Sequence, residues 1–138
     1  YGKYQNLQKP QGIIGFAFQA AINNTPIYLY GGGEVVRDFI YVQDLAELVR
    51  EIIDFDMLNL GNTEIYNVGY GKPYAIKDVV DKIKSVSGAD ITIIHKESRS
   101  FDCEYNVLDI FKAKEKYFWK PKFSLEDGLS EVWRWINK

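Results

Sequence analysis

Short β-like runs alternate with longer segments of helical periodicity along almost the whole chain. The β-like runs cover residues 27–30, 35–42, 65–68 and 90–96, with a further short run within 102–109. The helical segments cover residues 13–22, 43–53, 76–86, 109–117 and 124–138. Because strands that alternate with helices bury their apolar faces against one another in layers, this order predicts a mixed α/β fold. The length of 138 residues predicts a single domain, with a loop over residues 1–12.

The strongest helical signal lies in residues 43–53, where apolar residues recur at intervals of three, one, three and one. They are Leu45, Leu48, Val49, Ile52 and Ile53. This spacing places them along one side of a helix. Near the end of the chain, Ser124 and Asp127 have the spacing of a capping box and predict the start of the last helix.

The composition excludes several classes of function. A net charge of −2, with basic residues spread along the chain, indicates neither a nucleic-acid partner nor a membrane-binding basic face. No apolar run approaches the roughly 18 residues of a membrane span. One cysteine and one histidine exclude an internal disulfide and a structural zinc site, so a reducing compartment such as the cytoplasm is expected.

The N-terminus shows no signal peptide and begins with Tyr1 rather than methionine. We therefore expect the chain to be a piece of a longer protein.

No catalytic set is visible in the residues themselves. The glycines at 31–33 lead into a β-like run rather than a helix, and "GYGKP" at 69–73 has two glycines interrupted by a proline, so neither fits a dinucleotide-binding turn. His95 is predicted to be an ordinary strand-end residue. Cys103 has no second histidine or basic cluster that would lower its pKa and make it a nucleophile.

Several motifs nevertheless occur together in a fixed order: "YGGGE…RDFIYVQDLAE", "IYNVGYGKPYAIKDVV", "SRSFD" and "FKAKEKYFWKPKFSLEDGL". In this combination the chain resembles the C-terminal portion of the extended short-chain dehydrogenase/reductase family. Its members include NAD-dependent nucleotide-sugar epimerases and dehydratases such as UDP-glucose 4-epimerase. The resemblance covers nearly the whole chain.

In that family an N-terminal Rossmann domain binds NAD and carries a Tyr-x-x-x-Lys catalytic pair, and no tyrosine here is followed by lysine at that spacing. The resemblance thus implies a small α/β substrate-binding domain without its Rossmann domain, not catalytic alone. It implies a nucleoside diphosphate sugar as ligand, no cofactor bound by this chain, NAD in the intact parent enzyme, and a homodimeric parent.

The resemblance also implies three polar ligand contacts. Arg37 and Arg99 match two arginines that bind the diphosphate, and Asp102 matches an acid that contacts a ribose hydroxyl. A planar guanidinium suits this role because it offers paired, charge-assisted hydrogen bonds to phosphate oxygens. The competing interpretation of Arg37 is a surface ion pair with Asp38 or Glu34.

The other implied contacts are weaker. Tyr28 and Tyr30 match the segment beside the base, and Gln11 and Gly12 match the loop that enters the nucleotide cleft. The chain departs from the family pattern at Phe118, where a glycine normally ends a helix, so Phe118 must bear strain or the helix must end differently.

Other motif residues are interpreted as structural. Asp44 suits a helix start and Asn67 a turn. The aromatic residues Trp119, Phe123, Trp133 and Trp135 are expected to pack in the core rather than form a sugar platform.

Three functions therefore remain open. The chain is the nucleotide-sugar half of an NAD-dependent epimerase or dehydratase, a stand-alone nucleotide or glycan binding module, or a structural domain without a ligand. The resemblance favours the first.

Overall fold

The computed structural model describes residues 1–56 and 63–138. Its helices are α1 (Gly12–Asn23), the short 3₁₀ turn η1 (Gly31–Gly33), α2 (Val42–Asp56), α3 (Ile76–Ser87), α4 (Phe111–Tyr117) and α5 (Leu125–Ile136). Its strands are β1 (Ile27–Tyr30), β2 (Val36–Arg37), β3 (Tyr74–Ala75), β4 (Ile93–Lys96) and β5 (Tyr105–Asn106). The predicted mixed α/β fold is confirmed.

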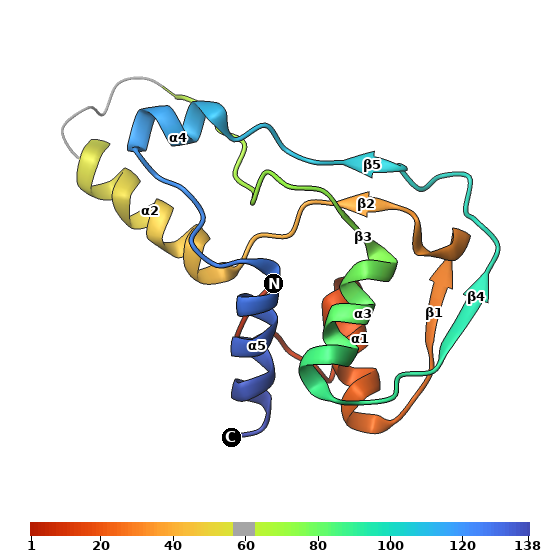
Figure 1. The fold of residues 1–138 in the computed structure, drawn as a ribbon. Helices are drawn as coiled ribbons and strands as arrows, with labels where there is room; N and C mark the ends of the chain where they lie inside the picture. The colour runs from red at the N-terminus through yellow and green to blue at the C-terminus, as the bar shows by residue number, and fades with distance from the viewer. Residues whose placement is uncertain (57–62) are drawn as a thin grey trace.

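The described strands form two small sheets. β1 pairs in parallel with β4, with Ile27 opposite Ile93 and Tyr30 opposite Lys96. β2 lies between β3, which is antiparallel to it, and β5, which is parallel. Figure 1 shows β4 and β5 running in succession along the outer edge of the molecule, so that the chain passes from one sheet to the other there.

The larger of two hydrophobic clusters lies where α1, α3 and α5 meet β1. It buries Phe18 and Ala17 of α1, Val79, Val80 and Ile83 of α3, Leu125, Leu129 and Val132 of α5, and Ile27 and Leu29 of β1. α3 supplies three fully buried residues from one face, as its helical periodicity predicts. This cluster fixes β1 over α1, and the candidate site forms between those two elements.

A smaller cluster joins α2 and α4. It consists of Leu48, Ile110, Ala113, Tyr117 and Trp119, with Ile52, Tyr66 and Val68 packed against it. Only one side of α2 takes part. Leu48 is 1% exposed, whereas Val49, on the next side of the same helix, is 48% exposed.

Two aspartates of "RDFIYVQDL" connect distant parts of the chain through backbone amides. Asp44 is fully buried, and its carboxylate accepts hydrogen bonds from the amides of Lys122 at 2.8 Å and Phe123 at 3.2 Å. Asp38 accepts from the amides of Tyr70, Gly71 and Leu108 at 2.7, 2.9 and 3.3 Å. The structural interpretation of Asp44 is confirmed, because the carboxylate ties the start of α2 to the segment before α5.

Two features of Tyr1 join it to α5. The Tyr1 hydroxyl donates to the Leu125 carbonyl at 3.3 Å, and burial raises the pKa of this phenol. The Tyr1 ring lies against Gly128, where a Cβ would collide with it. Glycine inside a helix destabilises it by about 1 kcal/mol relative to alanine. Position 128 is nevertheless glycine, because the Tyr1 ring occupies the space of a Cβ there.

One strand prediction is wrong and another is correct only in part. Residues 65–68 form no strand and pair with none of the described strands. In the predicted run 35–42, only Val36–Arg37 is a strand, and α2 begins at Val42. An apolar, β-branched run specifies an extended backbone, but a strand also needs a partner edge. Asn67, predicted to lie in a turn, is an exposed residue within 65–68.

The predicted core packing is confirmed for Trp119, Phe123 and Trp133. Trp135 instead contacts the exposed ring of Tyr4, with ring centroids 5.5 Å apart. Trp133 stacks on Phe18 with ring centroids 5.9 Å apart, and Phe123 contacts Tyr41 at 4.7 Å. Trp119 is 5% exposed and donates its indole N–H to the Asp44 carbonyl at 3.2 Å.

The first stability test replaces Asp44 with asparagine. The two backbone N–H groups bind different carboxylate oxygens, and asparagine replaces one of these oxygens with an NH₂ donor, so we expect Asp44→Asn to lower the free energy of unfolding by about 2–4 kcal/mol. Urea denaturation measures it. The matched control is Glu47→Gln, which removes only a partly exposed ion pair with Lys122 and should change stability by less than about 1 kcal/mol. Equal effects of the two variants would contradict this role of Asp44.

The second test concerns Phe118, which ends α4 with φ 50° and ψ 27° and is 90% exposed. An aromatic residue in this left-handed conformation is strained, and glycine is not. We expect Phe118→Gly to raise the free energy of unfolding by about 1 kcal/mol. Phe118→Ala keeps the strain and should stay within about 0.5 kcal/mol of the native chain; a stabilising alanine, or a destabilising glycine, would show that strain is not the controlling factor.

Candidate functional site

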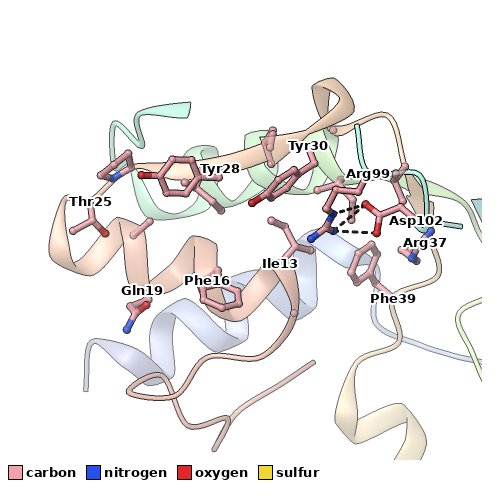
Figure 2. A pocket seen from close by; sticks show the side chains of 18 residues that line it. Ile13, Phe16, Gln19, Thr25, Tyr28, Tyr30, Arg37, Phe39, Arg99 and Asp102 are labelled. Carbon is pink, nitrogen blue, oxygen red and sulfur yellow. Dashed lines mark hydrogen bonds and ion pairs between the residues drawn. The ribbon is translucent and has the colours of Figure 1, made fainter. Parts of the chain in front are cut away.

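A cavity of about 650 Å³ lies between β1 and α1. Figure 2 shows Tyr28 and Tyr30 side by side along one wall and Phe16 and Ile13 of α1 along the other. Thr25 and Gln19 lie at one end, and Arg37, Arg99 and Asp102 gather at the opposite end. The cavity therefore has apolar and aromatic walls and one charged end.

The strand geometry of β1 explains why both tyrosines face the cavity. Burial alternates along β1, with Ile27 and Leu29 buried in the core and Tyr28 and Tyr30 exposed. Side chains two residues apart share one face of a strand, so the two rings form a continuous aromatic wall.

The triple glycine after β1 turns the chain back toward β2. Gly31, Gly32 and Gly33 all have positive φ, between 54° and 76°, which residues with side chains rarely adopt. A Cβ at Gly33 would lie 3.1 Å from atoms of Leu29 and Lys77. Beside this turn, a hydrogen bond from Lys77 to Glu34 at 2.5 Å raises the pKa of the lysine. The turn delivers Arg37 to the cavity six residues after Gly31.

Arg37 is held by main-chain carbonyls. Its Nη1 donates to the carbonyls of Val36 at 2.8 Å and Cys103 at 2.6 Å. The two acids that might have paired with it are engaged elsewhere, since Asp38 binds three backbone amides and Glu34 binds Lys77. The surface ion pair considered for Arg37 is thus not formed, and Arg37 lines the cavity.

Arg99 reaches the same end of the cavity from the segment between β4 and β5. It donates from Nε to Asp102 Oδ2 at 2.9 Å and from Nη2 to Asp102 Oδ1 at 3.1 Å. Its guanidinium lies 4.2 Å from the ring centroid of Tyr30 and 5.3 Å from that of Phe101. The two arginines predicted from distant parts of the sequence therefore line one cavity together with Asp102.

Gln11 and Gly12, which are adjacent in the sequence, differ in the spaces that they line. Gly12 lines the cavity and also a neighbouring hollow of about 480 Å³, whereas Gln11 lines only the hollow. The two spaces share Gly12, Ile13 and Phe39. The first five residues, Tyr1 to Gln5, line the hollow, and a hydrogen bond from Lys3 to Glu131 raises the pKa of the lysine.

Sequence reasoning missed several residues of the cavity wall, among them Ile13, Phe16, Gln19 and Phe39. Residues 13–22 are apolar at nearly every position and so predict a buried helix, yet Phe16 is 49% exposed. Helical spacing from the buried Ile14, Ala17 and Phe18 would have placed Phe16 on a different side. Phe101, which lies inside the quoted "SRSFD", does not line the cavity, but its ring is 5.3 Å from the Arg99 guanidinium.

Within the described residues, the glycine turns do not have the dinucleotide-binding arrangement. No glycine turn in residues 1–56 or 63–138 leads from a strand into a helix N-terminus, since η1 continues into β2, and β3 runs directly into α3.

His95 and Cys103, the other two residues considered for chemistry, lie at the surface of the described structure. His95 lies within the exposed part of β4, and Cys103 is exposed with its Sγ 3.3 Å from the Tyr105 carbonyl. Over the described residues, no cluster of three metal-ligating side chains occurs. Within the same ranges, none of the helices has the length and apolarity required to cross a bilayer.

Comparison with known proteins identifies relatives along the whole chain. The sequence model of the family described as GDP-mannose 4,6 dehydratase matches residues 1–132. A UDP-glucose 4-epimerase of Caenorhabditis elegans is 34% identical over 139 residues, covering 94% of this chain and 39% of that protein.

Two solved structures share the fold. The UDP-glucose 4-epimerase of Thermotoga maritima, solved with UDP-glucose, has a TM-score of 0.86 at 28% identity. The match covers 99% of this chain and 43% of the epimerase chain. A dTDP-glucose 4,6-dehydratase of Bacillus anthracis, solved in complex with NAD, has a TM-score of 0.79 at 27% identity, covering 99% and 41%. The chain thus spans about 40% of the length of these relatives.

Proposed function

Because the chain belongs to the GDP-mannose 4,6 dehydratase family and corresponds to the C-terminal portion of extended short-chain dehydrogenases/reductases, we propose that its cavity binds a nucleoside diphosphate sugar. The parent activity that we propose is an NAD-dependent nucleotide-sugar epimerase or dehydratase. In that enzyme, this chain supplies binding energy and orientation, and the hydride and proton transfers take place on residues outside it.

The observation that carries the proposal is the pair of guanidinium groups at one end of one cavity. A diphosphate presents two adjacent negative charges, and each arginine offers further N–H donors beyond those used within the protein. Arg37 uses Nη1 for carbonyls, and Arg99 uses Nε and Nη2 for Asp102. The unused donors are sufficient to bind phosphate oxygens from two sides.

The shape of the cavity supports an assignment of the ligand's other parts. The base would lie along the Tyr28 and Tyr30 wall, because aromatic faces suit flat heterocycles. The sugar would extend past Gly12 and Phe39 into the neighbouring hollow. The UDP-glucose named in the Thermotoga structure supports a uridine nucleotide as the first ligand to test.

The decisive test is a titration of the 138-residue chain with UDP, dTDP, CDP and GDP by calorimetry. We expect UDP or a similar diphosphate to bind and Arg37→Ala to weaken that binding by about 10- to 100-fold, because each charge-assisted hydrogen bond contributes about 1.5–3 kcal/mol.

Arg50→Ala is the matched control. It removes an equally charged residue from the exposed surface of α2, where Arg50 pairs with Glu51, and should leave the affinity unchanged. An unchanged affinity in Arg37→Ala, or an equal loss in both variants, would remove the arginine pair from the site.

The surface of α2 supports the second part of the proposal, which is an N-terminal NAD-binding domain as partner. Val42, Leu45, Val49 and Ile53 are each between 39 and 52% exposed and follow one another at helical spacing, and we call them the α2 stripe. The stripe extends about 16 Å along the helix. In Figure 1, α2 lies at the margin of the molecule with α4 beside it. A continuous apolar stripe of this kind is typical of an interface.

The alternating exposure of residues 65–68 supports the same partner. Tyr66 and Val68 pack on the smaller cluster, whereas Ile65 is 83% exposed, which is the alternation of a strand with one buried face. No strand pairs with this segment within the described part of the chain. A strand-like segment of this kind next to an apolar helix face suits the edge of a further sheet.

The partner is tested by reading the gene upstream of the Tyr1 codon and expressing the longer frame. We expect an in-frame glycine-rich strand–helix turn, and we expect Val49→Lys to lower the midpoint of thermal unfolding of the longer protein. In the 138-residue chain, the same variant should change stability by less than about 0.5 kcal/mol, because Val49 is already exposed.

Gln43→Lys, a change at another exposed residue of α2 that removes only its surface contact with Glu47, should change the stability of either protein by less than about 0.5 kcal/mol. A start codon directly before Tyr1 would instead favour a stand-alone binding module. An unaffected Val49→Lys variant of the longer protein would exclude the α2 stripe from the interface.

A further inference from the structure

Residues 3–11, which we call the strap, connect the surface of α5 to the start of α1 and form one wall of the hollow. Lys3 pairs with Glu131 of α5 at 2.6 Å, and the Tyr4 ring contacts that of Trp135. The strap residues that line the hollow are Lys3, Tyr4, Gln5 and Gln11. A group bound in the hollow would therefore lie against this segment.

Side chains hold the strap on α1. Gln5 Nε2 donates to the Gln11 carbonyl at 2.8 Å, and Gln19 Nε2 donates to the Leu7 carbonyl at 3.1 Å. Across the described part of the chain, no main-chain hydrogen bond joins residues 3–10 to another element. A segment held in this way opens at a lower free-energy cost than a helix or a paired strand does.

Gly15 forms a notch in α1 in which the strap is seated. A Cβ at this position would lie 2.9 Å from Gln5 Nε2 and 3.3 Å from Pro10 Cβ. Gly15 is a buried residue inside the helix, where alanine would be the better helix former. The glycine therefore serves the contact with the strap rather than the stability of the helix.

The backbone near each end of the strap suits a hinge. Gly12 has φ 67° and open space where a Cβ would lie, so the backbone conformation rather than packing requires glycine there. Tyr4 has φ 69°, which strains a residue with a ring, and its side chain is 84% exposed. An opening that relieves this strain costs correspondingly less free energy.

We propose that the strap is a movable element that closes the hollow over the sugar of a bound nucleotide sugar, and that Gly15 is the seat of its closed position. This inference rests on the proposed nucleotide-sugar site. Among its described lining residues, the cavity proposed for the base and diphosphate has none from the strap. Closure therefore responds to the sugar and not to the nucleoside diphosphate alone.

The variant that tests the seat is Gly15→Ala. Gly15 lines neither the cavity nor the hollow, so this variant affects a ligand only through the strap. Thermolysin cleaves on the amino side of leucine, and cleavage between Asn6 and Leu7 thus reports opening of the strap. We expect this cleavage to be about 3- to 10-fold faster in Gly15→Ala than in the native chain, with the helix content unchanged. An unchanged cleavage rate would overturn the proposal.

The native chain provides a test that needs no variant. UDP-glucose should slow cleavage between Asn6 and Leu7 by about 3- to 10-fold, whereas UDP at equal saturation should slow it by less than about 1.5-fold. Equal protection by the two ligands would show that the sugar does not hold the strap closed.

Calorimetry tests the same coupling through affinity. In Gly15→Ala, the affinity for UDP should stay at its native value, and the additional affinity that the glucose group gives UDP-glucose over UDP should be lost. Gln8→Ala is the control, since Gln8 is an exposed strap residue that lines neither space, and it should leave both affinities unchanged. A Gly15→Ala variant that binds both ligands as the native chain does, or that also loses affinity for UDP, would contradict a role confined to the strap.

Failure of this inference is distinguishable from failure of the proposed function. A native chain that binds neither UDP nor UDP-glucose would refute the proposed nucleotide-sugar site. The cleavage of Gly15→Ala in the absence of ligand would still decide whether Gly15 seats the strap. A native chain that binds UDP-glucose and gains no protection between Asn6 and Leu7 would refute the closing strap alone.

Discussion

The buried carboxylate of Asp44 is the interaction on which the arrangement of this chain depends. It binds two backbone amides 78 and 79 residues away in the sequence. A fully buried charge is stable only when its hydrogen bonds are satisfied, so the segment before α5 has a single position relative to α2. Asp38, six residues earlier, fixes the turn before β3 and residue Leu108 in the same way. One short motif thus orients the elements on both sides of it and leaves Arg37 directed at the cavity.

The cavity combines a rigid charged end with adaptable walls. Both arginines are bound by protein acceptors before any ligand arrives, so little side-chain order has to be created on binding. The aromatic wall stands on a strand that, among the described strands, pairs only with β4. The two solved relatives are named for sugar nucleotides with different bases, UDP-glucose and dTDP-glucose.

The sequence alone predicted the helices and site residues whose signal is local or lies within a motif. The helix α3 and the start of α5 followed from periodicity and from the Ser124–Asp127 spacing, and the family resemblance implied that Arg37 and Arg99 share one site. The sequence was insufficient where the outcome depends on what lies across space. Residues 65–68 have strand composition but no described partner, and the apolar face predicted for α2 divides into a buried side with Leu48 and an exposed side with Val49. The pairing of Asp102 with Arg99 was missed because three-residue spacing gives no indication of side-chain direction.

The contact between the Tyr1 ring and Gly128 couples the two ends of the described chain. The ring occupies space that any larger residue at position 128 would need, so homologous sequences should vary at these two positions together rather than independently. Removing this one ring would leave a groove along the C-terminal helix, and the damage would resemble that of a substitution in the hydrophobic interior.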